Sequence, residues 1–518
     1  MKKLFILVLG WALSCNSSQK TVAEKEENRA TDLAPSFAAS ITEEELKEHL
    51  FTYASDEFEG RETGKPGQKR AVDYLKKQYE ALGIPAAKSD GDYFQKVPLE
   101  FSKVPSGTLS VGDKSFTIGK AALTFSSISG SYKEVVYVGY GIEDGGYSDY
   151  TSVDVKGKVL LMKAGEPKNE DGTYVLSGSS EKSVWSNMSE AVGKRTELAA
   201  EKGANGVLYF DPQNFARFNR YYDFMKSNDS GRMQLQAENS ENFLVLLNEK
   251  SAKQLYPEIQ KADTPKTLTI AVTFDIKSED NKVDSENVAA ILKGSSKPDE
   301  YVIISSHLDH IGVNADGQVN NGADDDGSGT VALLEIAEAF KKAADAGKGP
   351  ERSIVFLHVT GEEKGLLGSK YYTDYKPIFP LSQTVANLNI DMIGRIDPKR
   401  TGDRNYVYLI GSDKLSTELH DLSEEVNKRY TNIEFDYTYN DENDPNRFYY
   451  RSDHYNFAKN NIPIIFYFNG THDDYHRPGD TPDKINYDLL KNRTQLIFYT
   501  AWEIANRAEK VVVDKATQ

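Results

Sequence analysis

The sequence predicts an α/β fold: a mostly parallel, mixed β-sheet flanked by helices, with an inserted β-rich domain. Two features of the chain carry this prediction. From residue 287 onward, short apolar runs typical of buried strands alternate with segments of helical periodicity, the pattern of a sheet covered on both faces. Between residues 101 and 278, short alternating strands separated by glycines replace that pattern. We therefore expect one domain inserted into another.

The length and charge of the chain limit its architecture and its partners. Its 518 residues predict two or three units, at about 150 residues per domain. The formal net charge is −17, and no run of lysine and arginine stands out. Because nucleic acids are bound through basic surfaces, we expect no nucleic-acid partner.

The first 15 residues resemble an export signal. They combine a basic start, a short apolar run and small residues before Cys15, the only cysteine of the chain. A cysteine at this point is similar to the lipid-modified residue of bacterial lipoproteins, and an ordinary cleaved signal is the alternative. We expect an exported protein that faces the periplasm or the cell surface and touches a membrane only through an N-terminal lipid anchor. With a single cysteine, its mature part holds no internal disulfide.

The segments before the insertion are a tether and the first part of the α/β domain. Residues 16–40 are polar and charged without periodicity, which predicts a flexible tether. Ordered structure is expected after it, because Thr42 and Glu45 have the spacing of a capping box. The α/β domain is assigned to residues 41–100 and 279–518.

Local patterns predict the elements of both domains. In the inserted domain, residues 101–278, strands are expected at 107–111, 134–141, 157–162 and 206–210, with one helix at 194–202. In the α/β domain, strands are expected at 301–306, 353–359, 385–390, 406–410 and 464–468. Its helices are expected at 68–82, 330–342, 364–375, 414–430 and 487–508.

An acidic stretch at residues 307–326 lies between a predicted strand and a predicted helix. It carries two histidines and five aspartates. In open α/β sheets this end of a strand is where ligands bind. Three later loops, at 361–365, 389–392 and 472–476, also follow apolar strands and offer the same residue types.

Such clusters suit a pair of divalent metal ions, which needs a bridging carboxylate and further imidazole or carboxylate ligands on each side. Taken singly, each cluster has a simpler explanation. The pair Glu362-Glu363 is typical of a solvated surface, and 324–326 could bind calcium, although the spacing of a helix–loop–helix calcium site is absent. Four clusters at strand ends favour one shared metal site.

The sequences of these clusters, taken together, resemble the motif series of the M28 family of zinc peptidases. The motifs are HLD at 307–309, GADDDGSG at 322–329, GEEKGLLGS at 361–369, NIDMIG at 389–394, RSDH at 451–454 and HRPGDT at 476–481. Their order and spacing match as well. The inserted domain, with VGYG at 138–141, is similar to a protease-associated (PA) domain, which is a weaker match.

The resemblance implies a role for each matching position. Asp325 would bridge two zinc ions, and the peptide bond between Asp325 and Asp326 would be cis. Glu362 would be the general base that takes a proton from the attacking water and passes it to the leaving amine. The remaining metal ligands would be His307 and Asp391 for one ion, and Glu363 and His476 for the other.

Further residues would support this site. Asp309 would orient the imidazole of His307, as ligand-orienting carboxylates do. Ser452 and Asp453 belong to a family motif beside the site. Tyr449 either contacts the substrate or packs in the wall of the site. His310 and His358 have no place in the family's site, so we expect them to be structural or surface residues.

The predicted function is that of a metal-dependent exopeptidase with peptide substrates, an aminopeptidase that removes N-terminal residues. A carboxypeptidase or dipeptidase of the same family is an alternative, and a receptor-like binding protein without activity is another. The inserted domain holds no assigned ligand and no histidine. It is expected to be non-catalytic, either limiting the length of the peptide admitted or serving as a spacer.

Overall fold

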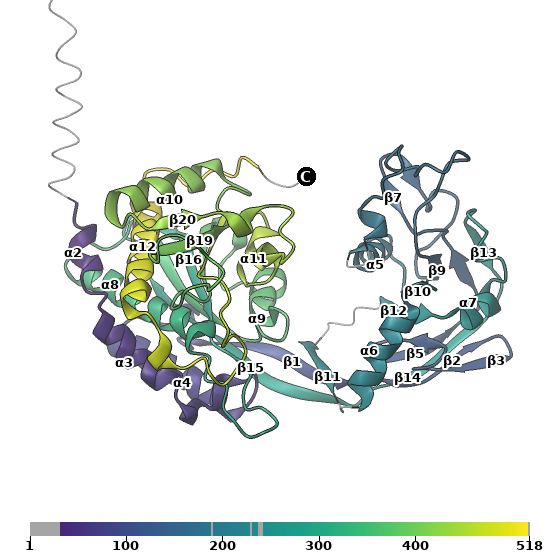
Figure 1. The fold of residues 1–518 in the computed structure, drawn as a ribbon, viewed down its shortest axis with the longest axis horizontal. Helices are drawn as coiled ribbons and strands as arrows, with labels where there is room; N and C mark the ends of the chain where they lie inside the picture. The colour runs from purple at the N-terminus through teal and green to yellow at the C-terminus, as the bar shows by residue number, and fades with distance from the viewer. Residues whose placement is uncertain (1–31, 188–189, 228–229, 237–241, 516–518) are drawn as a thin grey trace, which may run out of the picture. The chain divides into compact units, whose positions relative to one another are not determined.

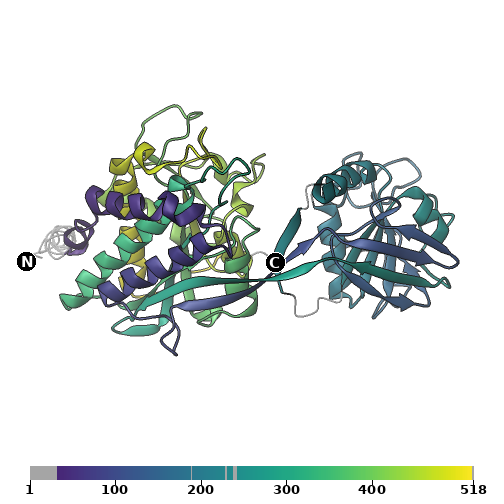
Figure 2. The same ribbon diagram turned by 90° about the horizontal axis from the view of Figure 1, so that it is seen from below.

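The computed structural model describes residues 32–187, 190–227, 230–236 and 242–515. The chain divides into two compact units: the described residues up to Val97 together with those from Ser285 onward, and the segment Pro98–Asp284 (Figure 1). The strands β1 (Phe94–Lys103) and β15 (Asp280–Leu292) carry the chain out of the first unit and back, and they are neighbours in one sheet (Figure 2). The predicted signal at 1–15 lies outside the described residues.

The first unit is built from helices and strands in alternation. Its α-helices are α2 (Ala34–Ala38), α3 (Glu43–Tyr53), α4 (Pro66–Leu82), α8 (Gly329–Asp345), α9 (Leu367–Lys370), α10 (Thr417–Tyr430), α11 (His454–Ala458) and α12 (Tyr487–Asn506). Its further strands are β16 (Lys297–His307), β17 (Arg352–Val359), β18 (Thr384–Ile390), β19 (Tyr406–Ile410), β20 (Glu434–Asp436) and β21 (Ile464–Phe468). Among the residues that the structure describes, no helix is long and apolar enough to cross a membrane.

The strands of the first unit form most of a nine-stranded mixed sheet in the order β11-β1-β15-β17-β16-β18-β21-β19-β20. The four central strands β17, β16, β18 and β21 are parallel, whereas β15 and β19 run antiparallel to their inner neighbours. The predicted fold class, a mostly parallel mixed sheet with flanking helices, is confirmed. The carboxyl ends of four adjacent strands therefore meet at one edge.

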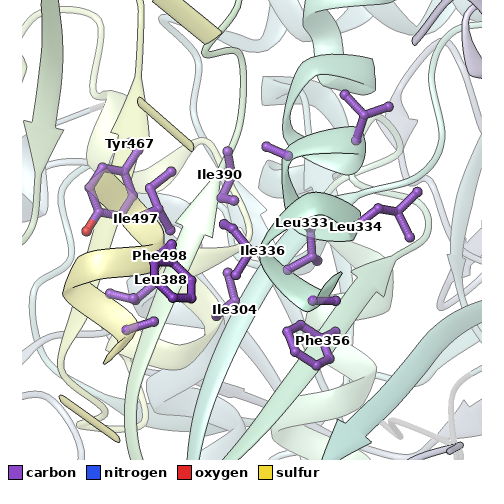
Figure 3. Close-up of a cluster of buried hydrophobic side chains, with 14 of the residues drawn as sticks. Ile304, Leu333, Leu334, Ile336, Phe356, Leu388, Ile390, Tyr467, Ile497 and Phe498 are labelled. Atoms are coloured by element: carbon purple, nitrogen blue, oxygen red, sulfur yellow. The ribbon is translucent and has the colours of Figure 1, made fainter. Parts of the chain in front are cut away.

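Alternate residues of β16 face opposite sides of this sheet. Val302 and Ile304 belong to the core beneath α8 and α12, while Tyr301 and Ile303 face a second core that also contains Phe457 of α11. Figure 3 shows Ile304 of β16 among apolar side chains of the neighbouring strands and of α8 and α12. Both faces are buried, which explains why the central strands read as continuous apolar runs.

The predicted tether extends too far toward the α/β domain. Residues 34–38 form helix α2, in which Ala34 and Ala38 are fully buried. The ring of Phe37 lies 5.7 Å from that of Trp502 in α12. A proline in the first turn and three small or aromatic apolar residues suffice for a short packed helix, although the segment is too short to show periodicity. The tether prediction is therefore wrong from residue 34 onward, and residues 16–31 lie outside the described part.

The second unit contains one sheet of six strands, in the order β13-β6-β9-β10-β12-β4, one of four strands, β3-β2-β14-β5, and the pair β7-β8. The strands are β2 (Ser106–Val111), β3 (Lys114–Thr117), β4 (Ala122–Leu123), β5 (Ile128–Tyr132), β6 (Val135–Tyr137), β7 (Glu143–Asp144), β8 (Tyr147–Ser148), β9 (Val159–Lys163), β10 (Gly206–Phe210), β11 (Gly231–Leu235), β12 (Phe243–Leu247), β13 (Lys266–Leu268) and β14 (Val272–Lys277). Of these, β11 pairs with the part of β1 that belongs to this unit.

Within its described residues, the second unit has three α-helices where the sequence predicts one: α5 (Ala191–Glu201), α6 (Phe215–Ser227) and α7 (Glu249–Leu255). Helix α6 carries apolar residues at helical spacing, at positions 215, 218, 222 and 225, so this helix could have been predicted, although only Tyr222 is buried. Helix α7 has seven residues and depends on Asn248, whose side chain accepts a hydrogen bond from the N–H of Ser251.

The segment predicted as a helix at 364–375 also differs. The structure has a loop up to Leu366, then the short α9 and one π-turn at Tyr371–Tyr375. Gly361 and Gly365 adopt φ values of +67° and +108°, which end regular structure on both sides of Glu362 and Glu363. This loop carries two of the predicted site residues.

Candidate metal centre

The predicted site residues come together at the carboxyl edge of the central strands. His307 ends β16, and the turn at Ala323–Ser328 before α8 carries Asp325. The loops after β17, β18 and β21 carry the rest, which are Glu362 and Glu363, Asp391, and His476. Because these four strands are neighbours in the sheet, residues far apart in the sequence converge on one place.

Asp325 stands at the middle of this group. Its Oδ1 lies 3.1 Å from Nε2 of His307, and its Oδ2 lies 3.0 Å from Nε2 of His476. The same nitrogen of His307 is 3.6 Å from Oδ1 of Asp391, and that of His476 is 3.1 Å from Oε2 of Glu363. One carboxylate therefore belongs to two clusters, each with one imidazole and one further carboxylate.

The donor atoms of these clusters fit zinc. Ligands about 2.0–2.2 Å from a tetrahedral zinc ion lie roughly 3.3–3.5 Å from one another. The nitrogen–oxygen separations around Asp325, 3.0–3.6 Å, are close to this value. Among the described residues, Oδ2 of Asp325 is buried and has no hydrogen-bond donor, although its neighbours are polar. His307, Asp325 and Asp391 together form a group with the geometry of a metal site.

Neighbouring aspartates fix the backbone of Asp325. The predicted cis peptide bond between Asp325 and Asp326 is present. The carboxylate of Asp326 accepts a hydrogen bond from the backbone N–H of His307, at 3.1 Å, and that of Asp324 accepts one from the N–H of Gly394, at 2.7 Å. The outer two aspartates of the run thus bind backbone, which leaves the middle one for the centre.

Asp309 orients His307, but through a different atom from the one expected. The backbone carbonyl oxygen of Asp309 lies 3.0 Å from Nδ1 of His307 and accepts its N–H. The carboxylate instead accepts hydrogen bonds from the hydroxyl of Thr63, at 2.7 Å, and from the backbone N–H of Glu362, at 3.2 Å. Asp309 therefore connects one predicted ligand with the predicted general base.

Ser452 and Asp453 both lie beside the centre, as predicted. The hydroxyl of Ser452 donates to Oδ2 of Asp391 over 2.6 Å and accepts a hydrogen bond from the side-chain amide of Asn389, at 2.9 Å. The carboxylate of Asp453 accepts a hydrogen bond from Ser369. Burial raises the pKa of Asp453 to about 7, and the nearby charge of His307 opposes this shift.

The pKa values of the carboxylates in the centre are shifted in different directions. Burial raises the pKa of Glu362 well above its usual value, and the carboxylates of Glu363 and Asp391 add to this effect. Burial acts on Asp325 in the same direction, but its contacts with the two imidazoles hold its pKa well below the usual range. Burial alone would lower the pKa of His476, yet the contacts with Asp325 and Glu363 raise it to about 10.

A residue of the N-terminal segment of the first unit holds the backbone of the acidic stretch in place. Arg61 is 1% exposed, and its guanidinium donates hydrogen bonds to the backbone carbonyls of Asn321, at 2.7 Å, and Gly322, at 2.8 Å. The ring of Tyr53 lies 4.7 Å from the same guanidinium carbon. Residues before the inserted unit thus hold the loop that contains Asp325.

Comparison with known proteins identifies this part of the chain. The model of peptidase family M28 matches residues 287–501, which include every predicted ligand. These residues are an M28 peptidase domain. The predicted family is confirmed, whereas the likeness of the second unit to a PA domain stays a prediction.

Three relatives of the M28 domain are named as aminopeptidases or as a glutamate carboxypeptidase. The aminopeptidase YwaD of Bacillus subtilis is 30% identical over 28% of this chain and 33% of its own length. Leucine aminopeptidase 1 of Sclerotinia sclerotiorum is 30% identical over 39% of this chain and 52% of its own. A probable glutamate carboxypeptidase of Arabidopsis thaliana is 36% identical over 20% of this chain and 14% of its own. The chain thus spans about half or less of each of these relatives.

Among solved structures, an aminopeptidase from Aneurinibacillus sp. strain AM-1 aligns with most of the chain. The alignment covers 92% of this chain and 97% of that one, with 21% sequence identity and a TM-score of 0.45.

A cavity of the M28 domain opens beside the candidate centre. Three of the assigned residues, Asp325, Glu362 and Asp391, line one side. Most of its other lining residues are apolar or aromatic, and Arg451 contributes a cationic group. The other lining residues are Met392, Phe448, Phe466, Phe468, Thr471 and Tyr475.

Two aromatic residues near the centre have different surroundings. Tyr449 packs its ring edge-on against His454, with 5.7 Å between the ring centres, and against Tyr450 and Tyr455, which is the wall-packing alternative. Tyr475 instead lines the cavity, and its ring stacks on that of His476 with 3.9 Å between centres. Its place directly before a predicted ligand is the signal that could have identified it.

His310 lies in the candidate metal centre of the M28 domain, whereas the sequence favours a structural or surface role for it. It is fully buried, and its Nδ1 lies 2.9 Å from Oε1 of Glu363. It forms a group with Asp325 and Glu363 whose atoms could hold a metal ion. Its position three residues after His307, on the same strand end, is the signal that points to the site.

Proposed function

We propose that the protein is a zinc-dependent exopeptidase that removes N-terminal residues from peptides. The observation that carries this proposal is the position of Asp325, whose two oxygens face two different imidazoles at 3.1 and 3.0 Å. A carboxylate shared between two ligand clusters is the arrangement that a pair of metal ions requires. The aminopeptidase relatives of the M28 domain support the same reaction class.

The residues that would hold the ions divide into two sets around Asp325. His307 and Asp391 would complete one set, and Glu363 and His476 the other. When bound, zinc ions supply Lewis acidity, which polarises a peptide carbonyl and promotes attack by water. Metal binding requires these imidazoles to be neutral, so uptake of metal would displace protons from the site.

Glu362 is suited to move the proton in this reaction. Its pKa is raised by burial, which makes the carboxylate a stronger base than an exposed one. The hydrogen bond from its backbone N–H to Asp309 fixes the loop that carries it. Glu362 would take a proton from the attacking water and donate it to the nitrogen of the leaving amine, so the carboxylate is regenerated.

The cavity beside the centre supports an N-terminal substrate end. Its lining includes Glu362, which is not a proposed metal ligand and whose carboxylate would attract the positive charge of a free α-amino group. Its apolar wall, with Met392 and Phe466, would bury an apolar first side chain. We therefore propose peptides with a free N-terminus and an apolar first residue as substrates.

One observation favours a second candidate, a carboxypeptidase or dipeptidase. Arg451 lines the same cavity, with its guanidinium carbon 4.8 Å from the centre of the Phe448 ring. An arginine is the residue that best binds a carboxylate, including the C-terminal carboxylate of a peptide. A binding protein without activity is a third candidate, and the intact cluster around Glu362 argues against it.

Blocked peptides distinguish these candidates. The zinc-loaded protein would be incubated with a short apolar peptide in free, N-acetylated and C-amidated forms, and the products separated by chromatography. An aminopeptidase cleaves the free and amidated forms and not the acetylated one. Cleavage of the acetylated form but not the amidated form would identify a carboxypeptidase, and no cleavage at all would indicate a binding protein.

Substitution of Arg451 sharpens the same test. If Arg451 binds a C-terminal carboxylate, Arg451→Gln weakens activity on the free peptide and leaves activity on the amidated peptide unchanged. For an aminopeptidase we expect both peptides to be affected equally. Arg404→Gln is a suitable control, because Arg404 forms an exposed ion pair with Asp488 away from the cavity lining.

A further inference from the structure

The imidazole of His310 has two carboxylate neighbours: Oδ2 of Asp325 lies 3.7 Å from Nδ1, and the closer contact, with Glu363, has a direction that is fixed by chemistry. Its Nδ1 lies 2.9 Å from Oε1 of Glu363. A carboxylate bound to metal carries no proton and can only accept, so Nδ1 must carry the hydrogen in this contact. The ring is held in place from two further sides, because its backbone N–H bonds to the carbonyl of Arg61, at 3.3 Å, and a side chain on Gly322 would collide with it.

The surroundings of Nε2, the other ring nitrogen of His310, distinguish a metal-ligand role from a hydrogen-bonding role. Nε2 is buried and has no hydrogen-bond partner within the described part of the chain. A histidine that binds metal almost always donates its second N–H to an acceptor, as His307 does to the carbonyl of Asp309. A ligand role for Nδ1 would put an N–H on Nε2 with nothing to accept it, which is unfavourable in a buried position. If Nδ1 carries the hydrogen, Nε2 has only a lone pair and no N–H that needs an acceptor.

The contact with Glu363 repeats an arrangement on the other side of the centre. There, the hydroxyl of Ser452 donates to Oδ2 of Asp391 over 2.6 Å. In both carboxylates one oxygen is occupied by a hydrogen-bond donor. The other faces an imidazole: Oδ1 of Asp391 lies 3.6 Å from His307, and Oε2 of Glu363 lies 3.1 Å from His476.

We propose that His310 is a positioning residue that occupies Oε1 of Glu363 and leaves Oε2 as its single metal-binding oxygen. This inference rests on the proposed zinc centre and deepens it. A carboxylate that binds through one oxygen uses one coordination position, whereas one that binds through both uses two. His310 thereby keeps a position open for water or substrate, which catalytic zinc sites require.

The test is a metal titration of the full chain loaded with Co²⁺, read from its visible absorption and from the metal content per chain. The absorption of Co²⁺ weakens as its coordination number rises. In His310→Ala we expect Glu363 to bind through both oxygens, so the absorption falls while two ions still bind. We expect affinity for the more weakly held ion to drop about 10–100-fold, as for other ligand-orienting residues.

A conservative variant separates the positioning role from a ligand role. In His310→Asn the side-chain amide places an N–H near the position of Nδ1 and is a poor zinc ligand. We expect this variant to restore the wild-type absorption and most of the affinity. If both variants lose one ion entirely, His310 is a ligand and the proposal is wrong. If His310→Ala leaves both affinity and absorption unchanged, the proposal is also wrong.

A control and the wild type make the outcomes interpretable. His358 is buried as completely as His310 but bonds to Tyr79, at 2.8 Å, and Ser306, at 3.0 Å. His358→Ala is expected to lower the melting temperature without changing the Co²⁺ spectrum. If the wild type itself binds no Co²⁺ or Zn²⁺, the proposed function fails. If it binds two ions and only the His310 variants behave unexpectedly, the failure concerns His310 alone.

Discussion

The carboxylate of Asp480 accepts a hydrogen bond from the backbone N–H of Asp325, at 3.1 Å. It also accepts the N–H of Asp324, at 3.0 Å, so both amides before the cis bond point to one carboxylate. Asp480 lies four residues after His476, which connects the loop of one predicted ligand with the backbone of the bridging one. The imidazole of His472 and the guanidinium of Arg395 lie within 4 Å of the same carboxylate.

Asp480→Ala should therefore weaken metal binding without removing a ligand. Two buried N–H groups would lose their acceptor, at a cost of about 1–3 kcal/mol each. We expect about 10–100-fold weaker zinc binding and activity that recovers when zinc is added in excess. Zinc titration followed by activity at saturating metal tests this. Asp345→Ala, which breaks an exposed ion pair with Lys341 at the far end of α8, is the control, and equal effects of both variants would contradict the prediction.

Glu362→Gln should keep both metal ions and lose turnover. The amide has the shape of the carboxylate but cannot take a proton from water. Loss of a general base is expected to lower kcat by about 10²–10⁴-fold. Metal analysis and steady-state kinetics on the same preparation check both parts. Near-full activity in this variant would show that another group acts as the base.

Asp325→Ala should lose metal as well as activity, because one side chain serves both proposed ions. We expect a zinc content well below that of the wild type after dialysis, and no recovery of activity with added zinc. Asp326→Asn is a useful comparison, since Asp326 binds only backbone N–H groups in the described structure. Full zinc occupancy in Asp325→Ala would overturn the bridging assignment.

Glu335 on α8 should make the first unit less stable in alkaline solution. Its side chain is 1% exposed, and burial, reinforced by Glu45 and Glu338, raises its pKa to about 8, against the opposing charge of Lys342. Nε2 of His49 lies 3.6 Å away, but burial lowers the pKa of that imidazole, so it is a weak counter-ion. Between pH 4.5 and about 8, folded Glu335 holds a proton that the unfolded chain has lost.

Stability therefore falls across this window as the pH rises, because the folded state binds more protons. Glu335→Gln cannot ionise, so we expect it to match the wild type near pH 5 and to be more stable above pH 8, by an amount on the order of a few kcal/mol. Melting temperatures at both pH values test this. Glu425→Gln, at an exposed position of α10, should show no such difference, and an unchanged pH profile in Glu335→Gln would contradict the prediction.

The sequence predicts the centre better than its surroundings, for a physical reason. His307 ends one strand with a continuous apolar run and Asp391 directly follows another, and such strands leave little freedom in register or direction. The position of each ligand is therefore set by its own segment. The contacts of Asp309 show the limit of this argument: its carboxylate bonds to Thr63, and no local pattern connects residues so far apart in the sequence.

Short elements were predicted less well for a related reason. Helix α2 depends on burial against α12, and the contact between Phe37 and Trp502 cannot be read from five residues. His310 was misplaced because its partner, Glu363, lies 53 positions away. In both cases tertiary packing, and not local propensity, decides the outcome.

The hydrogen bonds from Arg61 to the carbonyls of Asn321 and Gly322 affect which fragments of the peptidase are suitable for study. A fragment designed on the family match alone would begin at residue 287 and would lack this guanidinium. The loop before Asp325 would then carry bare carbonyls where it now has charged donors. A fragment that keeps these donors has to contain Arg61 as well as the matched residues, and is therefore discontinuous in sequence if the inserted unit is left out.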